Sequence, residues 1–511
     1  MGRRPTSGFP LFCLADGVSP AELRFGNLGY AREARASYLD FVAARERGEL
    51  PVCFPAVDVV EAIGADARGE APARGDFNSH GKRSSMGKTD QSGRMAMLGV
   101  IRNVVCALAL AVLPAVAQAA DPVRIGFSMA LTGGVAPNGK VVLAGLEIWR
   151  DDVNAKGGLL GRPVELVYYD DQSNPANVPG IYTKLISVDK VDLLLGPYAT
   201  NMIAPAMPVI MQQNRMTIGI LGVAVNRHFN YPKYFSMVPL GPNGVKAFSD
   251  GFFELAAAQN PKPRTVAIVA ADAEFARTVA DGARENAKAL GFETIYDKGY
   301  PPNTTDFAPV VRAVQAANAD IVFIGAYPPD TVGIVRAANE VNLMPKMFGG
   351  AMIGLLVTPI KVQLGPLANG IVIAESFVRA RTFDFPGVAD LLKRYQAKAA
   401  GLGIDPLGHA YAPFAYAAGQ VLARAVEETK SLDQDKLAAY IHGHPFQTVA
   451  GDIAFGKDGE WTKPRQVFSQ FQNVAGNDLD QFRDALRQPI LWPAEYKTGS
   501  FIYPYAEAKK K

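Results

Sequence analysis

Residues 121–174 constrain the fold of this chain more than any other stretch, because they contain a strand, a loop, a helix, a turn and a second strand in order. An apolar run over 124–130 predicts the first strand. Apolar residues at helical spacing over 142–153 predict the helix, and the glycine pair 157–158 is a typical helix end. Residues 163–169 are β-branched and aromatic enough for a second strand. This unit predicts an open α/β sheet, in which ligands bind outside the carboxyl ends of the strands.

The rest of the chain repeats this plan. Further strands are expected at 191–195, 216–222, 265–270, 292–296, 320–325, 346–349, 371–374 and 466–472. Further helices are expected at 178–188, 203–211, 244–257, 274–290, 304–317, 331–341, 388–400, 410–429 and 437–442. Gly196-Pro197 is expected to end one strand, the loosened pattern over 235–244 indicates a crossover between lobes, and 452–459 has the composition of a turn.

The opening unit resembles that of the bacterial periplasmic solute-binding proteins of the branched-chain amino-acid-binding type. The matching residues are Leu131-Thr132-Gly133, Asn154-Ala155-Lys156-Gly157-Gly158 and Tyr169-Asp170-Asp171. By this reading the resemblance runs from about residue 123 to the C-terminus.

The resemblance implies a type I periplasmic binding protein: two Rossmann-like α/β lobes joined by a three-strand hinge, with a ligand cleft between them that closes on binding. It implies an N-terminal lobe at 121–240 and 376–446, and a C-terminal lobe at 241–375 and 447–511.

The start of the chain predicts export. Residues 95–119 combine two methionines and an arginine with an apolar core and the small-residue motif Ala117-Gln118-Ala119, as in a secretory signal peptide. A membrane anchor over 103–117 would be shorter than the ~20 residues that a span needs. Cys106 lies early in the apolar run, which argues against a lipid anchor. We therefore predict a periplasmic protein, and we predict that residues 1–94, which show no sustained period, are not part of the working protein.

Composition excludes several classes of site. The net charge of +3 argues against a nucleic-acid binder. All three cysteines precede residue 120, so the remainder has no disulfide and no thiolate site. Residues 81–89 have one residue too many between their glycines for a phosphate-binding loop.

The sequence does not require an enzyme. It lacks the G-x-S-x-G motif of α/β-hydrolases. His442-Gly443-His444 could supply two metal ligands, but a surface loop is the favoured interpretation. Asp170-Asp171 could be an acid and base pair, and turn or capping chemistry after a strand is favoured. We expect no catalytic residue, no metal and no cofactor.

Candidate ligand-binding residues come from the loops that follow the expected strands: Thr132, Tyr198, Ala199, Thr200, Ala224, Val225, Phe275, Tyr327 and Ala351. Thr200 or Asn201 could cap the following helix, or could offer a side chain and backbone N–H groups to an anion.

In relatives that bind α-amino acids, the resemblance places the ligand carboxylate at positions like Ala199, Thr200 and Val225, and an acidic partner of the ammonium near Ala351. This chain differs at two of them, because Val225 has no hydroxyl and Ala351 has no carboxylate. An unpaired buried ammonium would be costly.

The other end of the expected pocket is apolar and aromatic. Tyr198, Phe275, Tyr327 and Met352 suit an aromatic or aliphatic acid, or an amide. Glu375 or Asp272 are alternative sources of a carboxylate.

These observations predict the periplasmic substrate-binding component of an ABC importer, which captures an aromatic or other non-amino-acid carboxylate by lobe closure. A binder of branched-chain amino acids or amides in the same importer class is the alternative. A ligand-sensing receptor domain without transport is the alternative from another class. The expected partners are a small-molecule ligand and a membrane permease, but no nucleic acid, and the chain is expected to be a monomer.

Overall fold

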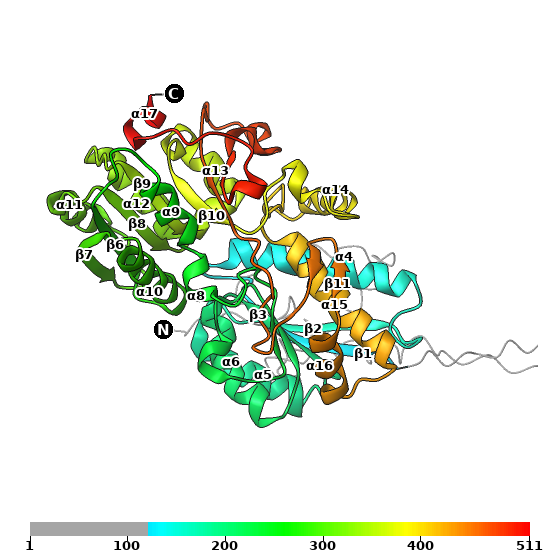
Figure 1. The fold of residues 1–511 in the computed structure, drawn as a ribbon. Coiled ribbons are helices and arrows are strands. Elements are labelled where there is room, and N and C mark those ends of the chain that lie inside the picture. Colours follow the sequence, from blue (N-terminus) through cyan, green and yellow to red (C-terminus); the bar gives the residue numbers. More distant parts are fainter. Residues whose placement is uncertain (1–120, 511) are drawn as a thin grey trace, which may run out of the picture. The chain divides into compact units, whose positions relative to one another are not determined.

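The computed structural model describes residues 121–510, whose helices and strands form a mixed α/β fold with two large sheets (Figure 1). Its first elements are β1 (Val123–Met129), α4 (Ala136–Ala155) and β2 (Val164–Asp170). β1 and β2 pair in parallel along their whole length, which confirms the predicted opening unit. The predicted N-terminal extension, signal peptide, three cysteines and segment 81–89 lie outside the described residues. None of the helices in the described part is long and apolar enough to cross a membrane.

The first sheet is parallel throughout, in the order β2-β1-β3-β4-β5. Its other strands are β3 (Leu193–Tyr198), β4 (Thr217–Ile220) and β5 (Tyr234–Ser236). The helices around it are α5 (Val178–Ser187), α6 (Thr200–Gln212), α7 (Asn226–Phe229), α14 (Val388–Ala399), α15 (Ala412–Thr429) and α16 (Gln434–Gly443). Successive strand residues face opposite sides. Leu194 therefore joins a core beneath α5 and α6, whereas Leu193 and Leu195 join the core beneath α4 and α15.

The second sheet has the order β14-β13-β10-β9-β8-β6-β7. Its strands are β6 (Thr265–Ala271), β7 (Glu293–Tyr300), β8 (Ile321–Ala326), β9 (Met347–Met352), β10 (Val372–Glu375), β13 (Val467–Gln470) and β14 (Ile490–Trp492). Its helices are α8 (Gly244–Ala247), α9 (Asp250–Ala257), α10 (Glu274–Ala289), α11 (Ala308–Ala317), α12 (Pro328–Glu340), α13 (Thr358–Leu364) and α17 (Tyr505–Lys509). The run β7-β6-β8-β9-β10 repeats the strand order of the first sheet, and β13 and β14 extend it antiparallel.

This shared order fixes where a ligand can bind. In each sheet the direction of winding reverses between the first and third strands, β1 and β3 in one and β6 and β8 in the other. Open α/β sheets bind ligands at the carboxyl ends of strands beside such a reversal. We call the elements around the first sheet the N-terminal lobe and those around the second the C-terminal lobe.

Three connections join the two lobes. The Arg465 N–H donates to the Pro239 carbonyl at 2.8 Å, and the Ser376 hydroxyl donates to Gln466 Oε1 at 2.8 Å, so the connections lie side by side. A small hairpin, β11 (Phe446–Thr448) and β12 (Gly451–Ile453), precedes the third connection. The connections are residues 237–243, 376–387 and 454–466. They agree with two lobes and a hinge, while the residue boundaries of the lobes stay a prediction.

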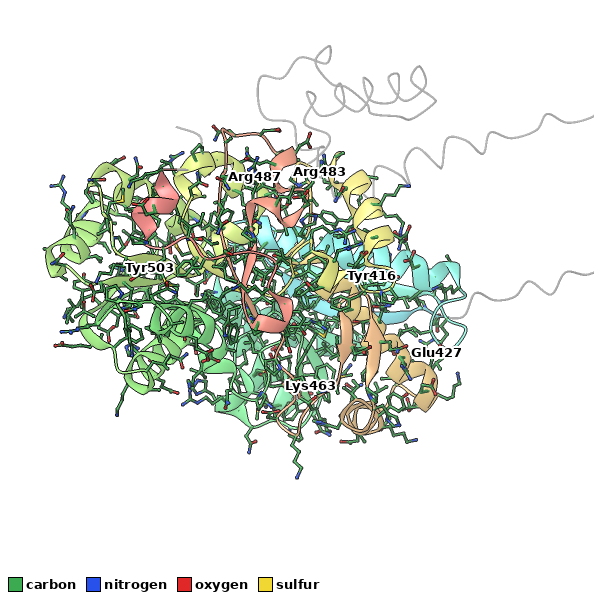
Figure 2. All side chains as sticks on the ribbon, turned by 45° about the horizontal axis from the view of Figure 1, so that its top comes forward. Tyr416, Glu427, Lys463, Arg483, Arg487 and Tyr503 are labelled. Carbon is green, nitrogen blue, oxygen red and sulfur yellow. The ribbon has the colours of Figure 1, made fainter. Side chains whose placement is uncertain are left out.

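α15 is tied to the start of the N-terminal lobe by side chains that Figure 2 labels. The Tyr416 hydroxyl donates to Asp152 Oδ2 on α4 at 2.6 Å, and Glu427 Oε1 accepts from the Leu160 N–H at 2.6 Å. These two hydrogen bonds join segments that are 264 and 267 positions apart in the sequence.

Three of the differences from the sequence-based expectations concern the backbone near the site. β3 continues through Gly196 and Pro197, because its pairing with β1 has already ended and its pairing with β4 is irregular there, so no ladder bond needs the missing proline N–H. β5 was not predicted, since three residues are too few to show a period. The helix expected over 244–257 is split into α8 and α9 at Phe248 and Ser249.

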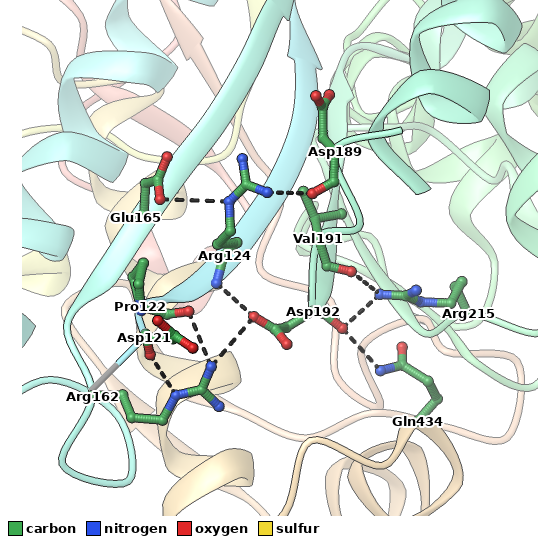
Figure 3. Close-up of polar contacts among 10 residues, drawn as sticks. All are labelled: Asp121, Pro122, Arg124, Arg162, Glu165, Asp189, Val191, Asp192, Arg215 and Gln434. Carbon is green, nitrogen blue, oxygen red and sulfur yellow. Dashed lines mark hydrogen bonds and ion pairs between the residues drawn. The ribbon is translucent and has the colours of Figure 1, made fainter. Parts of the chain in front are cut away.

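The amino ends of the first sheet carry a cluster of paired charges (Figure 3). Asp192 accepts from the Arg124 N–H at 2.8 Å and lies 3.8 Å from the Arg162 guanidinium. Arg215 donates to the carbonyls of Val191 at 2.8 Å and Asp192 at 2.5 Å. Arg124 is the second residue of β1, and the other three lie one or two residues before β2, β3 and β4, so the cluster joins four strands at one edge.

Candidate ligand-binding site

A cavity of about 40 Å³ lies where the carboxyl ends of the strands of both lobes meet. It is lined by Tyr198, Ala199, Thr200, Leu221, Val223, Val238, Phe248, Phe275, Tyr327, Ile353, Leu356, Ser376, Ala410 and Tyr411. Every one of these side chains is uncharged. The cavity therefore combines apolar walls with hydroxyl groups and backbone, a lining typical of small-molecule sites.

The turn from β3 into α6 has an unusual backbone conformation at Ala199. Ala199 has φ 78° and ψ 150°, a region that essentially only glycine occupies without strain. Its carbonyl accepts from the N–H groups of Met202 and Ile203. Thr200 and Asn201 lie in the first turn of α6, so no carbonyl within the helix can accept from their N–H groups. A strained residue thus presents two N–H donors and the positive end of a helix dipole beside the cavity.

Neither polar side chain of this first turn caps the helix, so the capping interpretation is wrong. The Thr200 hydroxyl accepts from the Val223 N–H at 2.9 Å and so fixes the loop after β4. Asn201 Oδ1 accepts from the Phe275 N–H at 2.9 Å and from the Tyr327 hydroxyl at 2.8 Å. Asn201 therefore reaches across to the C-terminal lobe.

Two tyrosines and an asparagine form a polar group at the wall of the cavity. The Asn138 amide Nδ2 donates to the hydroxyls of Tyr198 at 2.6 Å and Tyr411 at 2.9 Å. The two rings meet edge to face, with centroids 5.4 Å apart. Burial raises the pKa of Tyr198 to about 12 and raises that of Tyr411 further, so both hydroxyls are protonated at neutral pH. Both hydroxyls accept from Asn138, so neither uses its own proton in that contact.

Aromatic rings form much of the wall on the C-terminal lobe. Phe248 and Phe275 are edge to face with centroids 5.6 Å apart, and Phe275 and Tyr327 are 5.8 Å apart. Aromatic pairs of this geometry stabilise both a core and a flat ligand placed against them. The N-terminal turn of α10 holds Phe275, and the N-cap of α12 holds Tyr327.

Five of the predicted residues lie together at this cavity: Tyr198, Ala199, Thr200, Phe275 and Tyr327. The other four lie elsewhere. The Thr132 hydroxyl donates to Asp170 Oδ2 at 2.7 Å. Val225 is buried in the core beneath α5 and α6, Ala224 in the larger core, and Ala351 pairs with Gly325 inside the second sheet. As ligand-binding residues all nine remain predictions.

The alternative carboxylates have other partners. Glu375 is buried, where it accepts from the Ser469 hydroxyl at 3.3 Å and from the Gln488 amide. Asp272 pairs with Arg277 at 3.0 Å. Met352, expected in the aromatic end of the pocket, is buried at the end of β9.

The remaining lining residues were not predicted. Leu221, Val223, Ile353 and Ser376 follow the carboxyl ends of β4, β9 and β10, so the rule that selected Tyr198 could have found them once those strand ends were placed correctly. Val238 comes from a connection, Phe248 from a broken helix and Tyr411 from a helix start. Only the three-dimensional arrangement identifies residues of that kind.

The two motifs considered for other chemistry have structural partners. Asp170 accepts from Thr132 and the Leu131 N–H, and Asp171 accepts from the Ser128 hydroxyl and the Ser173 N–H, as expected for turn chemistry. Both ring nitrogens of His442 contact backbone carbonyls.

Comparison with known proteins agrees with this architecture. The periplasmic binding protein family matches residues 122–471. A Leu/Ile/Val-binding protein homologue, number 8, of Brucella abortus is 27% identical over 364 residues, covering 69% of this chain and 88% of the relative.

Two solved structures have the same fold. A leucine-binding protein from Thermotoga maritima has a TM-score of 0.60 at 19% identity, covering 69% of this chain and 96% of its own. A solute-binding protein of an ABC transporter from R. palustris, in complex with benzoate, has a TM-score of 0.60 at 18% identity, covering 72% and 95%. The family match spans most of the chain, and both α/β lobes have counterparts of known fold. The chain belongs to the periplasmic binding protein family, with the type I fold, and is a solute-binding protein rather than an enzyme.

Proposed function

We propose that this protein captures a small aromatic or other non-amino-acid carboxylate in the periplasm and presents it to the membrane permease of an ABC importer. The observation that carries the proposal is the uncharged lining of the interlobe cavity, beside the start of α6, whose first-turn N–H groups have no acceptor within the helix. Neutral donors can bind a carboxylate at a helix start.

An α-amino acid fits this lining poorly. Its ammonium would be buried without a carboxylate, because Glu375 and Asp272 are engaged elsewhere and no lining side chain is acidic. Leaving a charged donor buried and unpaired costs more than one ordinary hydrogen bond contributes. A carboxylate that lacks an amino group avoids this cost.

The body of the ligand is expected to be flat and apolar. Phe248, Phe275 and Tyr327 offer ring faces and edges, and Leu221 and Ile353 offer aliphatic surface. The hydroxyls of Tyr198 and Tyr411 can donate to an oxygen on the ligand. A benzoate or a hydroxybenzoate combines these features.

Neighbouring structures support the class without deciding the ligand. Solved relatives hold benzoate, 4-hydroxybenzoate or 3,4-dihydroxybenzoic acid, and another holds isoleucine. A branched-chain amino acid or an amide is therefore the second candidate. A sensor that signals through the same closure, without transport, is the candidate from another class.

The test is thermal unfolding of the purified protein against benzoates, short aliphatic acids, amides and branched-chain amino acids. A ligand at about 100 times its Kd should stabilise the fold by about 2.7 kcal/mol. We expect stabilisation by benzoates and none by leucine. Stabilisation by leucine or valine alone would overturn the proposed ligand class.

A further inference from the structure

Two hydrogen-bonded bridges, both made entirely by protein atoms, join the lobes beside the cavity. One starts at Asn201 and the other at Asp405, and neither residue lines the cavity. Both bridges are distinct from the three covalent connections of the hinge.

The Asn201 bridge joins the ligand-binding edges of the two sheets. Asn201 follows β3, and its Oδ1 accepts both the Phe275 N–H, which follows β6, and the Tyr327 hydroxyl, which follows β8. β3 lies at the winding reversal of the first sheet, and β6 and β8 flank that of the second. One amide oxygen therefore holds two elements of the opposite lobe.

The Asp405 bridge joins the lobes through the loop between α14 and α15. Asp405 Oδ1 accepts from the N–H groups of Leu407 and Gly408 within its own loop, whereas Oδ2 accepts from the Thr358 N–H at 2.7 Å. Thr358 is the first residue of α13, a helix whose own N-cap residue, Val357, makes no side-chain cap. Asp405 thus caps a helix of the opposite lobe, and both partners are buried.

From these contacts we infer that Asn201 and Asp405 are closure residues, which stabilise the closed arrangement of the lobes without contacting the ligand. Opening must break three hydrogen bonds between buried or half-buried groups and return their donors to water. A ligand that makes few contacts can then be retained for longer than its own contacts would allow, because part of the closed-state stability comes from the protein. The ligand class rests on the proposed function, but the closure role does not.

Thr358→Pro is the most direct test of the Asp405 bridge, because it removes the N–H donor of that bridge together with the Thr358 side chain. Proline is favoured in the first turn of a helix, and the preceding Val357, at φ −104° and ψ 135°, already has the extended backbone that a following proline requires. Thr358→Val is the matched control, since it removes the hydroxyl and keeps the N–H.

Two further variants test the same role from the N-terminal lobe. Asp405→Asn retains an oxygen for Leu407 and Gly408 but presents an NH₂ group to the Thr358 N–H, which breaks the bridge alone. Asn201→Ala removes the other bridge, and Asn201→Asp keeps both acceptor contacts and should rescue closure.

The first measurement is small-angle X-ray scattering of each full-length variant without added ligand. We expect a larger radius of gyration for Thr358→Pro, Asp405→Asn and Asn201→Ala than for Thr358→Val and Asn201→Asp. The second is the dissociation rate of benzoate, expected to rise about two- to tenfold for each broken bridge, with an association rate close to that of the parent protein.

Equal radii of gyration in all five variants and the parent would overturn the closure role. If benzoate does not bind, the proposed ligand class fails while the scattering comparison still decides the bridges. Circular dichroism melting of Thr358→Pro and Asp405→Asn shows that a change in radius comes from opening and not from unfolding.

Discussion

The two edges of the first sheet are built in opposite ways. At the amino ends of its strands, Arg124, Arg162 and Arg215 converge on Asp192 and nearby carbonyls, so charge is paired and backbone is satisfied (Figure 3). At the carboxyl ends, the cavity lining is uncharged, Ala199 is strained, and the first-turn N–H groups of α6 have no acceptor within the helix. The amino edge holds the strands together, and the carboxyl edge keeps hydrogen-bond donors available to a ligand. Removing a charged partner at the first edge should lower stability, and removing a hydrogen-bonding group that lines the cavity at the second should lower affinity.

The largest effect is expected from Asp192→Ala at the amino edge. It removes the acceptor of the Arg124 N–H and the partner of Arg162, so the free energy of unfolding should fall by about 2 to 3 kcal/mol, as for hydrogen bonds to a charged group. Urea denaturation measures this. Glu165→Ala is the control on the same edge, because its exposed pair with Arg124 at 3.5 Å should contribute less than about 1 kcal/mol. A changed ligand affinity in folded Asp192→Ala would contradict the separation of the two edges.

Thr200→Val should act in the opposite sense, on binding. It deletes the hydroxyl at the start of α6 and leaves the Val223 N–H without its acceptor, so we expect affinity to fall about 10- to 30-fold. Isothermal titration with the best ligand of the panel measures this. Thr200→Ser keeps the hydroxyl and should retain most of the affinity. A loss of affinity in Thr200→Ser with affinity retained in Thr200→Val would show that the methyl group, and not the hydroxyl, is what matters.

Asp171→Asn tests the pH dependence at the carboxyl edge. Burial raises the pKa of Asp171 to about 6, so the folded state holds this proton more tightly than the unfolded state. The contribution to stability is therefore full below pH 4 and is lost as pH rises through 6. The asparagine variant should be more stable than the parent by about 1 to 2 kcal/mol at pH 7 and nearly equal to it at pH 4. Chemical denaturation at both pH values measures the difference, and a gain independent of pH would reject this origin.

The smallest effect is expected from Ala199→Gly. Relief of strain at φ 78° and ψ 150° should exceed the entropic cost of glycine and raise stability by about 1 kcal/mol. A higher melting temperature with affinity retained would show that the strain is only tolerated. A lower melting temperature would show that the alanine methyl group makes packing contacts worth more than the strain.

Sequence patterns predicted the repeated units well, because elements such as α4 and β6 are long enough to show a period and end in recognisable turns. Predictions from these patterns were less accurate where tertiary contacts determine the backbone conformation. β3 crosses Gly196-Pro197 because Gly196 allows the backbone of β4 to come close, as an added Cβ there would lie 2.8 Å from Gly219. β5 is held mainly by its pairing with β4.

The candidate site shows the same division. Tyr198, Thr200, Phe275 and Tyr327 were found because each follows a strand, and topology brings strand ends together. Thr132 also follows a strand, yet its hydroxyl is drawn to Asp170, a contact that no spacing rule reveals. Tyr411 is distant in the sequence, and its hydroxyl accepts from the same Asn138 amide as that of Tyr198. This contact depends on how α15 packs on α4.

The uncharged lining of the cavity also bears on how the protein works in changing media. Lysine or arginine around a site would also attract an anion from a distance, and dissolved ions screen that long-range attraction beyond about 10 Å at 0.1 M salt. Backbone N–H groups and hydroxyls act by contact and carry no net charge to be screened. Capture should therefore continue almost unchanged between dilute and saline surroundings, a useful property in a compartment open to the outside medium.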